Sequence, residues 1–143
     1  METKFNFKSQ IATDKIQSER LLALGLKKDT SDMFYAALHF GTKVVGYRIS
    51  PNYNDEQFEI FTDDIPAWSL HRLIEMMPMT LIEDRVYHEY WELNVTPIMV
   101  IYRNQDEPSE WIGECLGQGM YNNIIDCIEW LIKEGYFNKE YLV

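Results

Sequence analysis

The sequence predicts an α+β fold, with an antiparallel sheet of about five to six strands and about three helices packed on it. Three observations predict this class. Segments with strand-like composition occur in hairpin-like groups, and single helical segments separate these groups. The two longer helical segments each have an apolar stripe at helical spacing. The chain has 143 residues, 46% of them hydrophobic, which fits one domain over residues 1–143.

The N-terminal region predicts an arm followed by a helix. Residues 1–13 are expected to form a mobile or loosely docked arm. A helix is predicted over residues 18–24, with a start as early as Thr13. Gly25 supplies the left-handed position that ends such a helix, and Leu26 can fold back onto its last turn.

The next region predicts a β-hairpin. Residues 33–40 and 44–50 are rich in aromatic and apolar side chains and flank the turn Gly41-Thr42-Lys43. Two such segments around a short glycine-containing turn are typical of a hairpin. Residues 58–61 predict a short third strand.

A second helix is predicted between two prolines. Asp63 or Asp64 is expected to cap it, Pro66 suits its first turn, and Pro78 stops it. Its apolar stripe has the i, i+3, i+4, i+7 spacing and consists of Leu70, Leu73, Ile74 and Met77.

The C-terminal half predicts three more strands. Residues 85–93 have long aromatic side chains compatible with a strand, and residues 98–103 form a second strand. Pro97 between them predicts a bend, an edge position or a bulge. Residues 110–115 are expected to pair back as a further strand.

The last helix is predicted over residues 120–134, where Gly135 ends it. The tail 136–143 is apolar enough to dock on the rest of the fold. The apolar stripe of this helix consists of Ile124, Ile125, Ile128, Leu131 and Ile132.

Two tryptophans lie outside these stripes and are the most informative residues of the chain. Trp68 falls nearly opposite the stripe of the second helix, and Trp130 falls on the far side of the last helix. Large rings are costly to leave in water, so another layer of the fold, a second copy of the chain or a partner is expected to cover them. Trp130 has the C-terminal tail close at hand, whereas Trp68 adjoins charged residues. The candidate partner-binding residues are therefore Trp68, His71, Arg72 and Glu75.

The charge distribution disfavours binding to nucleic acids. The net charge is −10, with six Lys and Arg against three Asp and Glu in residues 1–28, and seven against twenty in the remainder. Such a field repels phosphate backbones and suits a basic partner protein. Ordinary solubility explains the acidity equally well. The residues expected to steer a basic partner are Asp55, Glu56, Asp63 and Asp64.

No constellation of residues indicates catalysis, a metal or a cofactor. The segment 88–92 resembles the zinc-protease signature, but Glu92 stands where the second histidine is required. Gly117-Gln118-Gly119 lacks the further residues of a phosphate-binding loop. Cys115 and Cys127 have no metal-binding spacing. We expect two buried thiols there, with a disulfide as the alternative.

The sequence also bears on location. No apolar run approaches the roughly 18 residues that a membrane span needs, and residues 1–8 lack the apolar core of a signal peptide. A cytoplasmic protein with no membrane partner is expected.

Two stretches of the chain carry a resemblance. The first joins residues 21–26, Leu-Leu-Ala-Leu-Gly-Leu, to residues 30–33, Thr-Ser-Asp-Met. The second joins residues 65–78 to residues 129–136, Glu-Trp-Leu-Ile-Lys-Glu-Gly-Tyr. Together they resemble small proteins of unassigned function encoded by phages and mobile elements of Bacteroidetes. The resemblance brings no activity or catalytic residue. It implies a phage or prophage context, in which small acidic proteins often bind host proteins.

The expected function is a non-enzymatic acidic protein-interaction domain, such as a phage-encoded accessory or inhibitor protein that binds a host protein. One alternative is a small-ligand-binding protein or enzyme with a pocket between sheet and helices, which would include His71, His88 or Cys115. Another is a structural homodimer module.

Overall fold

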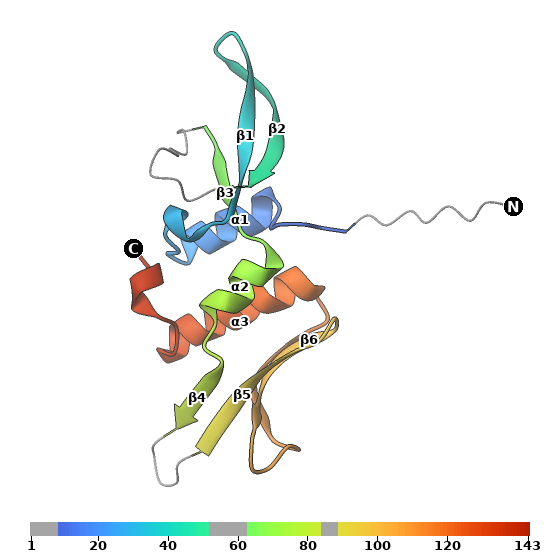
Figure 1. The fold of residues 1–143 in the computed structure, drawn as a ribbon, viewed down its shortest axis with the longest axis vertical. Helices are drawn as coiled ribbons and strands as arrows, with labels where there is room; N and C mark the ends of the chain where they lie inside the picture. The colour runs from blue at the N-terminus through green and yellow to red at the C-terminus, as the bar shows by residue number, and fades with distance from the viewer. Residues whose placement is uncertain (1–8, 52–62, 84–88) are drawn as a thin grey trace, which may run out of the picture.

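The computed structural model describes residues 9–51, 63–83 and 89–143. The α+β class is confirmed, but within these ranges the strands form two antiparallel sheets instead of one. One sheet has three strands and the other has four. The three α-helices of the described residues lie in a layer between the two sheets (Figure 1).

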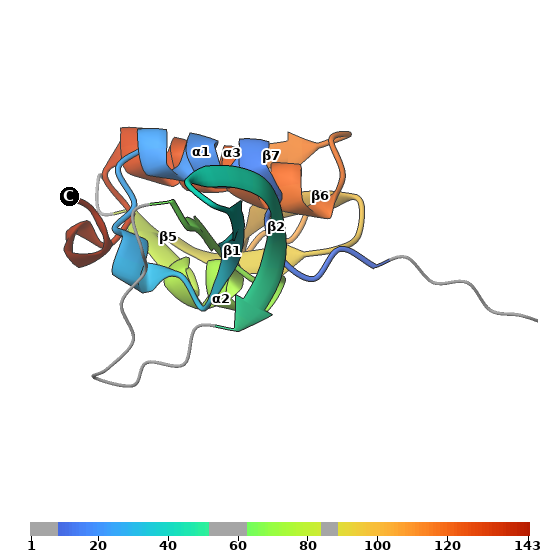
Figure 2. The same cartoon turned by 90° about the horizontal axis from the view of Figure 1, so that it is seen from above.

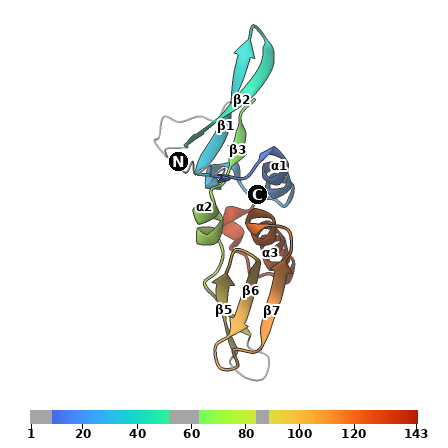
Figure 3. The same cartoon turned by 90° about the vertical axis from the view of Figure 1, so that its right-hand side faces the viewer.

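The three-stranded sheet contains the predicted hairpin. Strands β1 (Met33–Phe40) and β2 (Lys43–Pro51) pair antiparallel around the turn that Gly41 enters with a φ of +64°. Strand β3 (Ile65–Ala67) pairs with the other edge of β1, so the order is β2-β1-β3. The hairpin extends away from the helix layer (Figures 1 and 3). The strand predicted at 58–61 lies outside the described residues.

Helix α1 (Lys15–Ala23) has the predicted termination. Asp14 caps its first turn, within the predicted start region. Gly25 adopts a φ of +102°, and the Leu26 N–H donates to the Leu21 carbonyl at 3.2 Å. This bond satisfies one of the carbonyls that the helix end leaves free, which is why the chain turns here. A single 3₁₀ turn, η1 (Lys28–Thr30), follows.

Helix α2 (Leu70–Met76) begins later than predicted. Its N-cap is Ser69, whose hydroxyl accepts the Arg72 N–H at 3.2 Å, and neither Asp63 nor Asp64 caps it. Pro66 lies in β3 instead of the first helical turn. Proline suits both positions because an edge strand, like a first turn, tolerates a missing N–H. Pairing with β1, a non-local contact, decides between them.

The second sheet is a meander of four strands in the order of the chain. They pair antiparallel with their neighbours, and they are β4 (Thr80–Glu83), β5 (Glu89–Val95), β6 (Met99–Asn104) and β7 (Trp111–Leu116). The strands predicted at 98–103 and 110–115 are confirmed within one residue.

The remaining predictions for this sheet have mixed outcomes. Pro97 lies in the turn between β5 and β6, the predicted bend, where the Thr96 N–H donates to the Met99 carbonyl at 2.9 Å. The strand predicted at 85–93 overlaps β5, and its residues 85–88 lie outside the described part. Strand β4 was not predicted, because Pro78 indicates only that a helix stops.

Helix α3 (Met120–Glu134) is the centre of the molecule. It contacts β6 and β7 on one side and α1 and α2 on the other (Figures 2 and 3). Gly135 ends it with a φ of +78°, as predicted. Among the helices of the described residues none is long and apolar enough to cross a membrane.

The C-terminal tail docks as predicted. Phe137 is buried, and the 3₁₀ turn η2 (Lys139–Tyr141) follows it. Leu142 forms an antiparallel bridge with Leu26, and the Val143 N–H donates to the Gly25 carbonyl at 2.8 Å. The tail therefore joins the last helix to the end of the first.

Candidate functional site

Trp68 is a core residue. Its side chain is fully buried, and its indole N–H donates to Thr30 Oγ at 3.0 Å. Its backbone N–H donates to Thr13 Oγ at 3.1 Å, and the Thr13 N–H donates to the Trp68 carbonyl at 2.8 Å. The fold itself covers the ring, so Trp68 is corrected from a surface residue to a core residue. The docked part of the N-terminal arm contributes this cover.

The C-terminal tail and the four-stranded sheet both contact the ring of Trp130. Its ring centroid lies 6.1 Å from that of Tyr102 on β6 and 5.8 Å from that of Tyr136 in the tail. Gly113 of β7 approaches the ring closely, because a Cβ added there would lie 2.8 Å from Trp130 Cζ3. The predicted contact with the C-terminal tail is therefore present, and the four-stranded sheet covers the ring as well.

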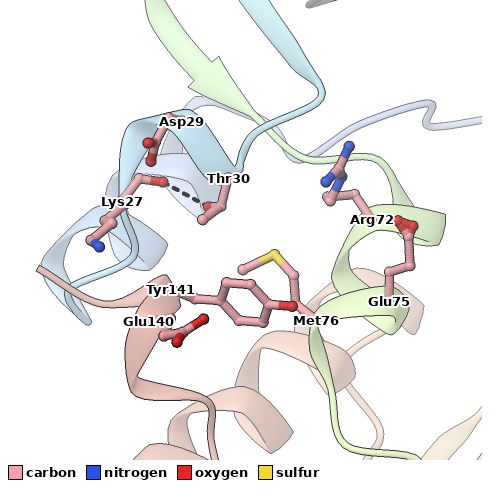
Figure 4. Close-up of a pocket in the computed structure, with 8 residues that line it drawn as sticks. All are labelled: Lys27, Asp29, Thr30, Arg72, Glu75, Met76, Glu140 and Tyr141. Atoms are coloured by element: carbon pink, nitrogen blue, oxygen red, sulfur yellow. Dashed lines mark hydrogen bonds between the residues drawn. The ribbon is translucent and has the colours of Figure 1, made fainter. Parts of the chain in front are cut away.

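The charged neighbours of Trp68 do lie at the surface. His71 Nε2 is 3.5 Å from Glu75 Oε2, and the His71 side chain is 88% exposed. Arg72 and Glu75 line a cavity of about 400 Å³ between η1, α2 and η2 (Figure 4). Its walls carry both signs of charge, and the other lining residues are Lys27, Asp29, Thr30, Met76, Glu140 and Tyr141. With Trp68 in the core, this group has no large exposed ring.

The acidic residues expected to steer a partner are divided. Asp63 Oδ2 lies 3.0 Å from His39 Nε2, and Asp64 Oδ1 accepts the Ala37 N–H of β1 at 2.9 Å. Both carboxylates therefore bind groups of the hairpin. Asp55 and Glu56 lie outside the described residues, as does His88.

An apolar surface that the sequence reading missed lies on the four-stranded sheet. The face that packs on α3 carries Trp91, Val100 and Tyr102, so by strand alternation the neighbouring residues point the other way. Ile82 and Tyr90 face each other across β4 and β5 on that opposite side. We call this side the open face, and its large exposed side chains are Ile82 (55% exposed), Tyr90 (42%), Trp111 (43%) and Leu116 (52%).

The charged groups of the open face hold Trp111 in place. The guanidinium carbon of Arg103 lies 5.6 Å from the centre of the Trp111 ring. The Trp111 indole N–H donates to Glu114 Oε2 at 2.7 Å. Because a cation–π contact and a hydrogen bond both orient it, the exposed ring is preorganised.

The open face is acidic overall. Glu92 pairs in register with Arg103, and Glu114 accepts from Trp111. Three more exposed carboxylates follow in the connection between β6 and β7, namely those of Asp106, Glu107 and Glu110. Arg103 is engaged locally, since its Nη1 donates to the Pro108 carbonyl at 2.6 Å and its plane lies over Trp111.

The sequence contains a pattern that points to this face, but the pattern does not say which side of the sheet is exposed. Alternation in residues 110–115 predicts a half-buried strand without saying which half is buried. Trp111 is the largest side chain of that strand and would be expected in the core. It lies outside because α3 packs on the other face, against Tyr102 and Gly113.

The described residues offer little for catalysis. Among them no group of three or more His, Cys, Asp or Glu side chains could hold a metal ion. In the described part of the chain, side chains of α3 and of the four-stranded sheet pack into one buried cluster, and the cavities lined by Arg72 and by Arg20 lie at the surface.

Comparison with protein families, curated proteins and solved structures finds no match for this chain.

Proposed function

We propose that this chain is a non-enzymatic protein-interaction domain that docks the open face of its four-stranded sheet onto a protein partner. The observation that carries this proposal is the group of four large exposed side chains on that face, Ile82, Tyr90, Trp111 and Leu116. An antiparallel sheet covered on one side normally presents polar residues to water on the other. Here the side that faces water keeps two aromatic rings and two aliphatic side chains.

The energetics favour a protein ligand. Covering apolar surface is worth roughly 25 cal/mol per Å², and tryptophan and tyrosine dominate the binding energy of many interfaces. Trp111 is already held by Arg103 and Glu114, so its side chain would lose little conformational entropy when a partner binds.

The charges favour a basic partner. Among the described residues around Trp111, carboxylates outnumber guanidinium groups, and the guanidinium of Arg103 is engaged with the ring and with a backbone carbonyl. A partner with lysine or arginine residues around an apolar patch would be steered towards this face. The phage or mobile-element resemblance supports the further proposal that the partner is a host protein, which the domain assists or inhibits.

The test is site-specific photo-crosslinking in cells that carry the gene. A photoreactive phenylalanine analogue replaces Tyr90 on the open face, and in a second protein it replaces Phe40, which is 81% exposed at the hairpin tip. We expect one dominant protein adduct from position 90 and none from position 40. The yield of the adduct should be lower at high salt, because salt screens the electrostatic attraction between the two proteins.

Matched variants check the assignment. In the protein with the photoreactive residue at position 90, Trp111→Ala should abolish capture of that protein, whereas Tyr47→Ala should preserve it. Tyr47 is a fair control because it is 41% exposed but lies on β2 of the other sheet. Adducts from position 40 alone, or a capture that Trp111→Ala leaves unchanged, would contradict the proposal. An adduct between two copies of the chain would instead support the homodimer alternative.

A small-ligand function is the second candidate, and the cavity beside Arg72 and Glu75 favours it. Both signs of charge and the Tyr141 side chain line this cavity of about 400 Å³ (Figure 4), a size in the range of ligand sites. Arg72→Ala should weaken binding of a charged metabolite identified by thermal-shift screening. A screen in which no metabolite raises the melting temperature argues against this candidate.

A further inference from the structure

Two thiols meet at the interface between β7 and α3. Cys115 belongs to β7 and is partly exposed, whereas Cys127 belongs to α3 and is fully buried. Cys115 packs against the buried core cluster that contains Cys127, and the two thiols interact directly. Cys115 also lines a surface cavity of about 680 Å³ that opens towards α1. One thiol is therefore reachable from solvent, and the other lies directly behind it.

We propose that Cys115 is a peroxide-reactive thiol and that Cys127 resolves its oxidised form into a Cys115–Cys127 disulfide. The proposal rests on the packing of Cys115 against the buried core that contains Cys127, on the unequal burial of the two side chains and on the cavity that leads to Cys115. Cys115 lies on the α3 side of the sheet, whereas its neighbours Glu114 and Leu116 belong to the open face and line the same cavity at the edge of the sheet. The proposal does not use the open face as a binding surface.

The surroundings favour the thiolate of Cys115. The hydrogen bond from Cys127 lowers the pKa of Cys115, and the Arg20 guanidinium acts in the same direction. Burial and the carboxylates of Asp126 and Glu114 oppose this effect without reversing it. The same hydrogen bond, followed by burial, raises the pKa of Cys127, which stays protonated as the donor. The Cys127 proton must leave before or as its sulfur attacks, because the thiolate is the nucleophile.

The chemistry balances with hydrogen peroxide as the oxidant. The Cys115 thiolate attacks one peroxide oxygen, so that an S–O bond forms, the O–O bond breaks and hydroxide leaves. Sulfur loses two electrons and the peroxide gains them. The Cys127 sulfur then attacks the Cys115 sulfenic acid, an S–S bond forms, and the hydroxyl leaves as water with the Cys127 proton.

The cavity favours a small uncharged oxidant. Glu114 and Asp126 line it, and its one cation, Arg20, is held by Asp126 at 2.7 Å. This lining disfavours anionic disulfides such as oxidised glutathione, whereas hydrogen peroxide carries no charge. The other residues of the lining include Gln17, Gln118 and Asn122, which are polar and neutral.

The experiment treats the reduced, folded protein with hydrogen peroxide and with dimedone, which traps sulfenic acids. In the unsubstituted protein we expect a mass loss of two hydrogens, a Cys115–Cys127 cross-linked peptide and no dimedone adduct. Cys127→Ser should give a dimedone adduct on Cys115, and Cys115→Ser should give neither product. Cys127→Ala serves as a second variant, since it keeps a small apolar group in the core if serine impairs folding.

A second readout is the rate of alkylation by iodoacetamide, which avoids oxidation altogether. Cys115 should react more than about 10-fold faster than Cys127 in the folded protein. Its rate should fall in Cys127→Ala, because the donor that favours the thiolate is gone. A protein that stays reduced at peroxide levels that oxidise free glutathione, a dimedone adduct on Cys127 as the sole product, or faster alkylation of Cys127 would each overturn the proposal.

Discussion

At the scale of single residues, three tryptophans that look alike in sequence have three different environments. Trp68 is fully buried and donates to Thr30, Trp130 is partly buried against Tyr102 and Tyr136, and Trp111 is held at the surface by Arg103 and Glu114. Helical periodicity identifies aromatic rings that lie outside the apolar stripe of a helix, but it does not say which other segment packs on them.

Trp68→Ala tests the burial of this ring. We expect the free energy of unfolding to fall by about 3–5 kcal/mol, because the change empties a fully buried site and leaves Thr30 without its donor. Trp111→Ala on the open face should cost less than about 1 kcal/mol. Urea unfolding followed by far-UV circular dichroism measures both, and equal losses would place Trp68 outside the core.

Gly113→Ala tests the close approach of β7 to α3. Gly113 has a φ of +65°, and an added Cβ would lie 2.8 Å from the Trp130 ring. A left-handed alanine and displacement of the ring together should cost about 2–4 kcal/mol. Gly41→Ala is the matched control, because Gly41 has a φ of +64° with nothing within 4 Å of its added Cβ. It should cost about 1–2 kcal/mol, from backbone strain alone.

Tyr102→Phe tests the pH dependence of stability. Burial raises the pKa of Tyr102 above its ordinary value, and its hydroxyl donates to the Pro78 carbonyl at 2.8 Å. The unfolded chain therefore ionises this group first, and stability should fall as pH rises above about 10. The variant should lose about 1 kcal/mol at neutral pH but show a smaller alkaline loss than the unsubstituted protein. Urea midpoints at pH 7 and at about pH 11 measure this, with Tyr90→Phe as the control. Parallel pH profiles for the protein and its Tyr102 variant would show that Tyr102 does not contribute.

At the scale of elements, local signals are reliable where they are satisfied within a few residues of the chain. The end of α1 at Gly25, the hairpin around Gly41 and the end of α3 at Gly135 follow from backbone conformations that glycine adopts readily. The predicted start of α2 was wrong because Pro66 suits both a first helical turn and an edge strand. Pairing of β3 with β1 selects the strand.

Ser69→Ala tests the corrected cap of α2. The Ser69 hydroxyl accepts the Arg72 N–H and donates to the Asp32 carboxylate, so its loss should cost about 1–2 kcal/mol. Asp63→Ala removes one of the two residues that the sequence predicts as the cap, and it breaks an exposed contact with His39. It should cost at most about 1 kcal/mol. Chemical denaturation measures the free energy of unfolding of both variants. A larger loss from Asp63→Ala than from Ser69→Ala would mean that Ser69 is not the cap of α2.

At the scale of the whole molecule, α3 connects the four-stranded sheet to the other two helices. Its two sides contact the four-stranded sheet and the other helices, so its complete apolar stripe and Trp130 on the far side serve two layers at once. α3 is an amphipathic helix whose apolar residues are buried between these layers, whereas Asp126, Glu129 and Lys133 lie on its remaining surface.

Ile128→Ala tests whether the layers unfold together. Ile128 is fully buried in α3, and the substitution should cost about 2–5 kcal/mol. Because α3 contacts both the other helices and the four-stranded sheet, we expect one transition in which circular dichroism and tryptophan fluorescence coincide, before and after the substitution. Two separated transitions would mean that the hairpin sheet is stable without α3.

The amino-acid pattern alone determines that this chain is an acidic α+β domain, where its helices end, where the hairpin turns and that its tail docks. These properties depend on neighbouring residues, on glycine conformations and on apolar periodicity. The division of the strands into two sheets, the cover over Trp68, the meeting of Cys115 with Cys127 and the exposure of Trp111 depend on contacts between distant segments. Strand alternation leaves both faces of a sheet equivalent, and the packing of α3 on one of them makes the other the open face.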